Sequence, residues 1–257
     1  MKSEKRSRGV SEVVGYLLVF SIVVTIVSVI YASGMPMVER TKENSALQSM
    51  ETVFITLQSN IKKVALAQSP VRTMKLNLIK GSISANKNAG NITITVDGNN
   101  TPPIQFGNIE YTLGARKMIY ELGAVIESTP GGSIIVSDPP IFFTNSSGKA
   151  HVFISVINAS GTFSSGGGIA EMSMRQDNPS NDTRVIYNGT VDYEYVNISI
   201  NSSYAYAWIN YLQRDAEKMR LNVLSSHPDP TASFGYVNVS DAKGLNLTLV
   251  SHNVSIS

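Results

Sequence analysis

Hydrophobic residues follow three successive patterns along this chain, and each pattern predicts a different kind of structure. The first is an apolar run over residues 13–32, which contains no charge and no proline and reads VVGYLLVFSIVVTIVSVIYA. A helix of that length spans roughly 30 Å, the thickness of the hydrocarbon core of a bilayer. Its clearly polar side chains are the hydroxyls of Ser21, Thr25 and Ser28, which can bond to carbonyls of the preceding turn. Because the run is apolar on all sides, it predicts a membrane-spanning helix.

The second pattern has the period of an amphipathic helix. Apolar residues recur at intervals of three and four at Leu47, Met50, Phe54, Leu57, Ile61 and Val64. This stripe predicts a stem helix that ends near Ser69-Pro70 and packs on the chain's own domain, or on neighbouring subunits as well. Between the two helical stretches, Gly34-Met35-Pro36 is expected to break or kink the helix, because proline removes a backbone donor and clashes with the previous turn.

The third pattern begins near Thr73, where apolar and polar residues alternate in short runs separated by turn-forming clusters at 86–91 and 97–100. One helix is expected within this region, over Ser203–Lys218, with Ser203 as its N-cap and an aromatic face that includes Trp208. Many short strands predict a mainly antiparallel β-sandwich or barrel, and the fold class is therefore α+β. The expected strands are 74–79, 92–96, 109–113, 117–127, 133–136, 141–144, 151–158, 169–175, 184–187, 191–200, 220–224, 235–239 and 245–255.

The flanks of the apolar run predict its orientation. Four basic residues lie between Met1 and Gly9 against the single acid Glu4, whereas the charges at 39–43 cancel. Basic residues are retained on the cytoplasmic side, so we expect a cytoplasmic N-terminus, a single membrane span and an extracellular C-terminal domain.

Three fates of the N-terminus are compatible with this pattern. A signal peptide cleaved near Ala32-Ser33-Gly34 is one, although its apolar region is longer than is usual; an uncleaved anchor is another. The third follows from the segment Arg8-Gly9-Val10-Ser11-Glu12, which continues directly into the apolar run and resembles the class III signal of archaeal type IV pilin-like proteins. That resemblance implies that a prepilin peptidase cuts between Gly9 and Val10. The corresponding regions are a leader (1–9), a transmembrane and assembly helix (10–35), the stem (36–70) and an extracellular β-rich domain (71–257).

The same resemblance implies self-association through the N-terminal helix. Glu12 would be the third residue of the mature chain, whereas bacterial-type pilins carry their glutamate at the fifth. Its carboxylate can stabilise the helix N-terminus or neutralise the terminal amine of a neighbouring subunit. Gly15, with Ser21 and Thr25, offers a small-residue face for close helix packing. The segment from Ile109 to Ile141 is similar to ectodomains of uncharacterised archaeal membrane-anchored proteins.

Composition narrows the function classes. A net charge of +2 leaves no electrostatic footprint for nucleic acid, and the absence of cysteine excludes disulfides and thiolate chemistry. The three histidines, His151, His227 and His252, lack the spacing of a zinc motif; His227 with Asp229 is expected to be an exposed turn. The glycines at 166–168 lack the lysine of a phosphate loop and are expected to form a flexible connector. We therefore expect no enzyme activity, no metal site and no cofactor.

Sequons for N-glycosylation are frequent beyond residue 90. Their extracellular placement makes them available to a glycosylation system, and the sites expected in turns are Asn99, Asn145, Asn181 and Asn188. The eleven sequons are at Asn91, Asn99, Asn145, Asn158, Asn181, Asn188, Asn197, Asn201, Asn238, Asn246 and Asn253.

Together these observations lead to one expected function and one alternative. The expected function is a structural cell-surface subunit of an archaeal type IV pilin-like filament, anchored in the membrane before assembly and carrying N-glycans. The alternative is a monomeric membrane-anchored receptor or adhesin with the same glycosylated β-domain.

Overall fold

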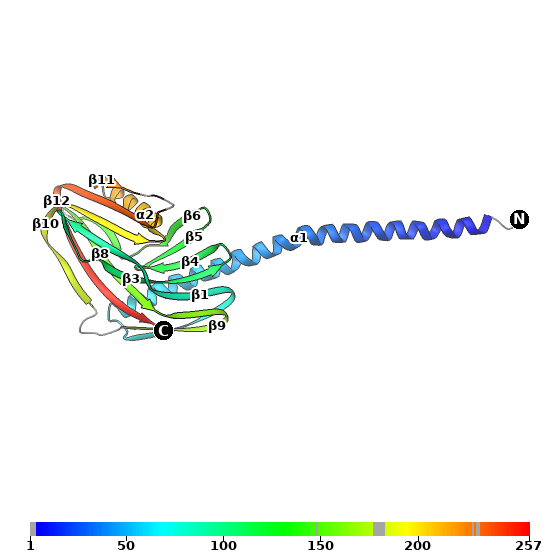
Figure 1. The fold of residues 1–257 in the computed structure, drawn as a ribbon, viewed down its shortest axis with the longest axis horizontal. Coiled ribbons are helices and arrows are strands. Elements are labelled where there is room, and N and C mark those ends of the chain that lie inside the picture. The colour runs from blue at the N-terminus through cyan, green and yellow to red at the C-terminus, as the bar shows by residue number, and fades with distance from the viewer. Residues whose placement is uncertain (1–3, 147–148, 177–182, 228, 230–231) are drawn as a thin grey trace. The chain divides into compact units, whose positions relative to one another are not determined.

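The computed structural model describes residues 4–146, 149–176, 183–227, 229 and 232–257. The chain divides into two units, one that ends at Ala46 and one that comprises Leu47–Ser257. A single helix, α1 (Glu4–Ala65), contributes to both, and a mainly antiparallel sheet with one short helix completes the second unit (Figure 1). The predicted α+β class, with a long N-terminal helix and a β-rich domain, is confirmed.

A break or a kink is predicted at Gly34-Met35-Pro36; helix α1 continues through Pro36, so the break is wrong. Proline removes one backbone donor, while the neighbouring residues keep their helical hydrogen bonds. The predicted stem stripe is confirmed, and its partner is the chain's own sheet. Its six apolar residues, from Leu47 to Val64, are all at most 4% exposed and share one core with strand residues such as Leu76 and Met172.

The sheet is built from fewer and much longer strands than the alternation predicts. In order, its neighbouring strands are β6-β5-β4-β3-β1-β10-β12-β8-β7, and all pairs are antiparallel except β12 with β8. The strands are β1 (Val71–Val96), β2 (Asn99–Asn100), β3 (Ile104–Leu113), β4 (Arg116–Glu121), β5 (Ala124–Thr129), β6 (Gly132–Ser137), β7 (Ile141–Ser146), β8 (Lys149–Gly161), β9 (Phe163–Gln176), β10 (Thr183–Ser202), β11 (Asn222–Ser226) and β12 (Phe234–Ile256).

Long strands connect two separate hydrophobic clusters. The first half of β1 contributes Leu78 to the cluster under the stem, and its second half contributes Ile94 to a cluster under the short helix α2 (Ala205–Lys218). Strands β8 and β12 divide their residues between the two clusters in the same way. The stem and α2 therefore each complete a core of their own against one shared sheet.

Two predicted interruptions lie inside strands. The cluster 86–91 is a register shift within β1, and Gly166-Gly167-Gly168 belongs to β9 opposite a second register shift, so neither is a separate turn or connector. Gly167 and Gly168 have positive φ, which a bulged strand accommodates most easily at glycine.

Conversely, the strand predicted over 117–127 is a hairpin. It turns at Leu122 and Gly123, whose φ angles of 50° and 85° are typical of a two-residue turn that requires positive φ at both positions. Leucine is an unusual residue for that conformation.

Helix α2 agrees with its prediction in extent and in its buried face. Trp208, Ile209 and Leu212 are fully buried in the second cluster. Ser203 is not the N-cap: that position is Tyr204, which has no side-chain capping bond, and the Tyr204 amide instead donates to Ser202 Oγ at 3.0 Å.

Candidate functional site: the apolar helix and a cleft beside the stem

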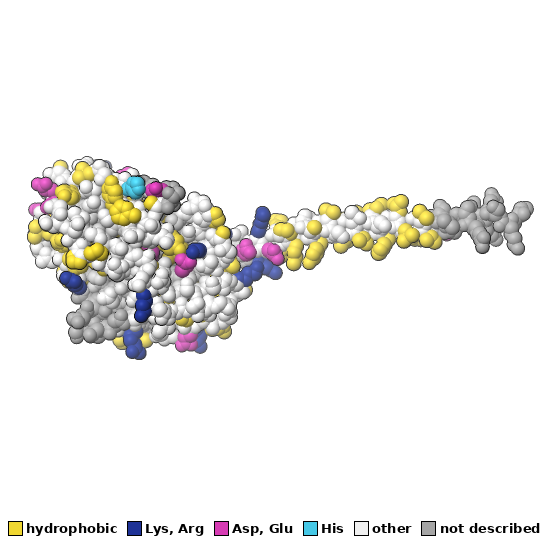
Figure 2. Space-filling view, in the orientation of Figure 1, with side chains coloured by type: hydrophobic (Ala, Val, Ile, Leu, Met, Phe, Trp, Pro, Cys, Tyr) yellow, Lys and Arg dark blue, Asp and Glu magenta, His cyan; other side chains and the backbone are white. Residues whose placement is uncertain are grey.

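The apolar part of α1 is exposed along its whole length. Every residue from Val13 to Ala32 is exposed, and the hydrophobic side chains line this segment in Figure 2. The hydroxyls of Ser21, Thr25 and Ser28 donate to the carbonyls four residues earlier, at 2.7–2.8 Å. Because these hydroxyls are already paired, they need no further partner in lipid. The segment also has the length and composition of a helix that can cross a membrane.

The predicted processing and assembly residues lie on this helix. The backbone of Gly9 and Val10 is helical, while the side chains up to residue 11 lie outside the described part of the chain. Glu12 is exposed, and a Cβ added to Gly15 would have no neighbour within 4 Å. The surface at Gly15 is therefore open to another helix.

The sequons fall into different environments of the β-domain. Asn181 lies outside the described residues. Exposed side chains belong to Asn99, Asn145, Asn188 and Asn201. Half-buried side chains belong to Asn91, Asn158, Asn197, Asn238, Asn246 and Asn253.

Several sequons lie next to one another across the sheet. Asn158 Nδ2 donates to Asn253 Oδ1 at 3.1 Å, and Asn158 Oδ1 accepts from the Gly107 amide at 2.9 Å, so this pair is held within the structure. Cross-strand neighbours have Cβ atoms about 5 Å apart, too close for two attached glycans to project independently. The register pairs are Asn91 with Asn201, Asn197 with Asn238, and Asn158 with Asn253.

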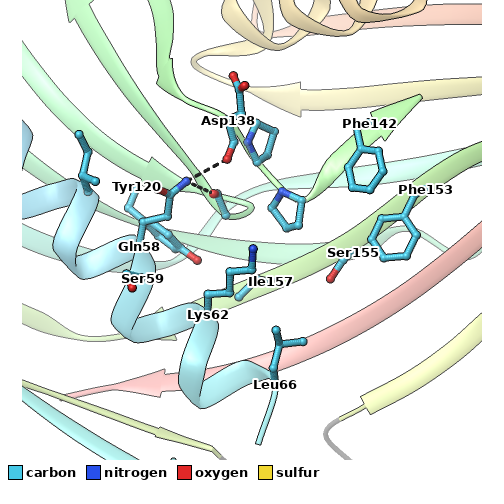
Figure 3. A pocket seen from close by; sticks show the side chains of 14 residues that line it. Gln58, Ser59, Lys62, Leu66, Tyr120, Asp138, Phe142, Phe153, Ser155 and Ile157 are labelled. Atoms are coloured by element: carbon cyan, nitrogen blue, oxygen red, sulfur yellow. Dashed lines mark hydrogen bonds between the residues drawn. The ribbon is translucent and has the colours of Figure 1, made fainter. Parts of the chain in front are cut away.

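A cleft lies beside the C-terminal half of the stem. Gln58 holds the stem against the sheet: its Nε2 donates to the carbonyls of Gly123 (2.7 Å) and Asp138 (3.0 Å), and its Oε1 accepts from Ser137 Oγ (2.7 Å). These bonds join α1 to the β4–β5 turn and to the segment between β6 and β7 (Figure 3). The stem is thereby fixed as one wall of the cleft.

The cleft has a volume of about 560 Å³ and combines an aromatic wall with a few polar groups. Phe142 on β7 and Phe153 on β8 are stacked, with ring centroids 5.0 Å apart. Lys62 and Tyr120 also line the space, and Figure 3 shows the hydroxyl of Tyr120 and the side chain of Lys62 directed into it. Within the described residues, the buried Tyr120 hydroxyl has no hydrogen-bond partner.

A second polar group is buried in the core beneath α2. Glu121 is fully buried at the end of β4; one carboxylate oxygen accepts from Trp208 Nε1 at 2.8 Å and from Ser202 Oγ at 2.7 Å. Burial raises the pKa of the Glu121 carboxyl to about 7, which the two hydrogen bonds counteract and the nearby charge of Glu110 reinforces. Glu110 itself accepts from Tyr204 Oη at 2.6 Å and forms an ion pair with Lys117 at 2.7 Å.

Sequence reasoning located the helix and its hydroxyls but missed the cleft and the buried carboxylate. Gln58 and Asp138 are 80 positions apart, and Glu121 and Trp208 are 87 apart, so no local spacing connects them. The available local signal was the non-apolar Glu121 at the end of a strongly apolar segment. A charged residue in such a position indicates a buried partner network.

Comparison with known proteins identifies the family of this chain. Residues 8–257 match the family of unknown function DUF7289, and the chain belongs to that family. An uncharacterised protein of the archaeon Archaeoglobus fulgidus is 28% identical over 81 residues, which is 32% of this chain and 27% of that protein. The chain therefore matches only about a quarter of that relative's length. No solved structure matches.

Proposed function

We propose that this member of the DUF7289 family is a structural cell-surface subunit of an archaeal type IV pilin-like filament. Prepilin peptidase removes residues 1–9, and the subunits polymerise through the N-terminal helix while the glycosylated β-domain faces outward. The observation that carries the proposal is the uncovered apolar helix: from Val13 to Ala32 its side chains are exposed and its inner hydroxyls are already paired.

Such a surface requires apolar surroundings on every side. Before assembly these are lipid, and in a filament they are the helices of other subunits. Association between apolar helices depends on close packing at small residues rather than on charge, and the open surface at Gly15 supports this mode. The carboxylate of Glu12 is exposed on the same helix, where it can pair with the terminal amine of a neighbouring subunit.

The alternative, a monomeric membrane-anchored receptor or adhesin, is favoured by a different observation. The cleft beside Gln58 lies entirely within the unit Leu47–Ser257, and a binding function there requires no polymerisation. Both proposals place the same helix in the membrane, so the experiment has to separate processing from assembly.

The test is expression of the full-length chain in an archaeal host that has a prepilin peptidase. N-terminal sequencing and intact mass should show a mature chain that starts at Val10, and electron microscopy of sheared surface material should show filaments. Gly9→Leu should leave the leader attached. Gly15→Leu should be processed normally but assemble poorly. The matched control Val19→Leu should be processed and should assemble like wild type.

The outcomes distinguish the candidates. A wild-type chain that still begins at Met1 contradicts the pilin-like route. Processing without filaments, in wild type and in Gly15→Leu alike, supports the anchored monomer. A start just after residue 32 indicates a secreted domain.

A further inference from the structure

Two polar groups at the stem cleft, the Tyr120 hydroxyl and the Lys62 ammonium, have no partner among the described residues. Tyr120 is fully buried, and its hydroxyl forms no hydrogen bond with any described residue. Buried hydroxyls are nearly always paired, because an unpaired one loses its hydrogen bond to water without replacement. The position of this hydroxyl at the cleft indicates that a partner comes from outside the chain.

The Tyr120 hydroxyl is suited to donate a hydrogen bond. Burial raises the pKa of the Tyr120 phenol far above its usual range, so the group stays protonated. A protonated hydroxyl with no acceptor in its surroundings favours a ligand atom that accepts, such as a carboxylate or carbonyl oxygen.

Lys62 adds a positive charge on the same side of the cleft. Its side chain is exposed, and no carboxylate among the described residues forms an ion pair with it. Asp138 also lines the cleft. It uses its backbone carbonyl to hold Gln58, and in Figure 3 its carboxylate points away from Lys62. The unpaired ammonium therefore selects for a negatively charged group.

The cleft also has an apolar wall, which is open to solvent at its rim. Phe142 is 40% exposed, and Ile55 and Leu66 of the stem are 42% and 43% exposed. Together with Phe153 they offer an aromatic and aliphatic surface next to the polar end. The volume of about 560 Å³ lies within the range of roughly 300–1,000 Å³ that is typical of small-molecule sites.

We propose that this cleft binds a small amphipathic organic acid. The acid group lies between Lys62 Nζ and Tyr120 Oη, and the apolar body lies against Phe142 and Phe153. Because the Tyr120 hydroxyl forms the floor, the flexible Lys62 side chain moves to admit the acid group. The three Gln58 hydrogen bonds keep the walls in place when the ligand enters.

The experiment uses the full-length chain in lipid nanodiscs, because detergent micelles would absorb an apolar probe. The probe is 3-(4-fluorophenyl)propionate, followed by ¹⁹F NMR during titration, and its neutral counterpart is 3-(4-fluorophenyl)propanol. Empty nanodiscs measure partition into lipid. We expect saturable binding of the acid and an affinity for the alcohol that is lower by about tenfold or more, the loss that corresponds to one charge-assisted hydrogen bond.

Three variants assign the binding to the cleft. Lys62→Gln should weaken binding of the acid by about tenfold and leave the affinity for the uncharged alcohol nearly unchanged. Tyr120→Phe should also weaken binding of the acid by about tenfold and that of the alcohol less, because an alcohol oxygen accepts a weaker hydrogen bond than a carboxylate. Tyr120→Phe removes a hydroxyl that has no partner among the described residues, so it should fold like wild type. The matched control Lys63→Gln changes a neighbouring lysine that does not line the cleft and should bind like wild type.

Two results overturn the proposal. One is the absence of saturable binding of the acid beyond that of empty nanodiscs. The other is binding that both Lys62→Gln and Tyr120→Phe leave unchanged, which would place the probe elsewhere. Neither result bears on processing at Gly9 or on filament formation.

Discussion

Replacing Glu121 by glutamine should remove most of a pH dependence from the stability of the β-domain. The carboxylate is fully buried between β4 and α2, and within the described part of the chain it forms no ion pair; its hydrogen bonds come from Trp208 and Ser202. Glutamine has nearly the same shape and retains an oxygen to accept these bonds. The substitution therefore removes the ionisation and keeps most of the packing.

The direction and size of the change in stability with pH follow from the pKa of Glu121. Burial raises the pKa of Glu121 from 4.5 to about 7, so the folded state holds a proton at pH values where the unfolded chain has lost it. Stability from this group is greatest below about pH 4.5 and declines until about pH 7. At about 1.36 kcal/mol per pKa unit, a shift of roughly 2.5 units corresponds to about 3 kcal/mol.

Other groups contribute to the pH profile and must be subtracted. Burial lowers the pKa of His151, so that histidine destabilises the fold as the pH falls through about 6.5, the opposite direction. Hydrogen bonds and the ion pair with Lys117 outweigh burial and lower the pKa of Glu110, which places its effect below the window of interest. The difference between wild type and Glu121→Gln cancels both contributions.

The assay is denaturant unfolding of the full-length chain in nanodiscs at pH 5, 6, 7 and 8, followed by tryptophan fluorescence. Trp208 is the single tryptophan of the chain, and its indole donates directly to Glu121, so its emission also reports the ionisation in the folded state. Wild type should lose about 2.5 kcal/mol relative to the variant between pH 5 and pH 8, because part of the full change of about 3 kcal/mol has already occurred at pH 5. Its native emission should titrate with a midpoint near pH 7.

Parallel stability profiles of wild type and Glu121→Gln would contradict this prediction, and so would native Trp208 emission that shows no transition between pH 6 and pH 8 in wild type. Glu171→Gln, at an exposed position on β9, controls for the loss of one negative charge.

Three further predictions follow from the contacts described above. Gly123→Ala should lower the free energy of unfolding by about 2 kcal/mol or more in the same denaturant assay, because alanine at positive φ costs about 1–2 kcal/mol and its Cβ would lie 2.5 Å from Pro140 Cδ. A stability equal to wild type would show that the turn relaxes freely. Gln58→Leu removes three hydrogen bonds and should cost about 2–3 kcal/mol, with faster amide exchange in the stem; Gln48→Leu, on the exposed side, is the control. Glycopeptide mapping of native protein should find Asn188 occupied and Asn158 unmodified, since the Asn158 amide is bonded on both sides; a fully occupied Asn158 would contradict this.

Periodicity in the sequence predicted the elements whose environment is uniform along their length. The stem stripe from Leu47 to Val64 is buried at every predicted position, and the aromatic face of α2 is buried as expected. In both cases one surface of a helix faces one hydrophobic cluster, so spacing alone contains the information.

The same reasoning failed where a long strand is irregular. Residues 86–91 and Gly166-Gly167-Gly168 are typical of turns, yet the first occupy a register shift inside β1 and the second lie within β9 opposite another. A bulge needs the same backbone freedom as a turn, and the choice between them depends on whether a partner strand lies alongside. The turn at Leu122 and Gly123 was missed for the converse reason: leucine is a poor residue for positive φ, and its burial in the core compensates.

The two parts of helix α1 differ in what covers their apolar side chains. Near the sheet its apolar stripe is covered by the chain itself, and Gln58 adds polar bonds that fix the contact. From Val13 to Ala32 the apolar side chains are exposed on every side, and no stripe distinguishes an inner from an outer face. A soluble coiled coil would show such a stripe, with polar residues opposite it. The uniform apolar surface instead suits surroundings that are apolar in all directions, which lipid and a bundle of like helices both provide. The apolar surface therefore does not distinguish an anchored monomer from a filament subunit. The filament proposal is tested most directly by measuring processing first and assembly second.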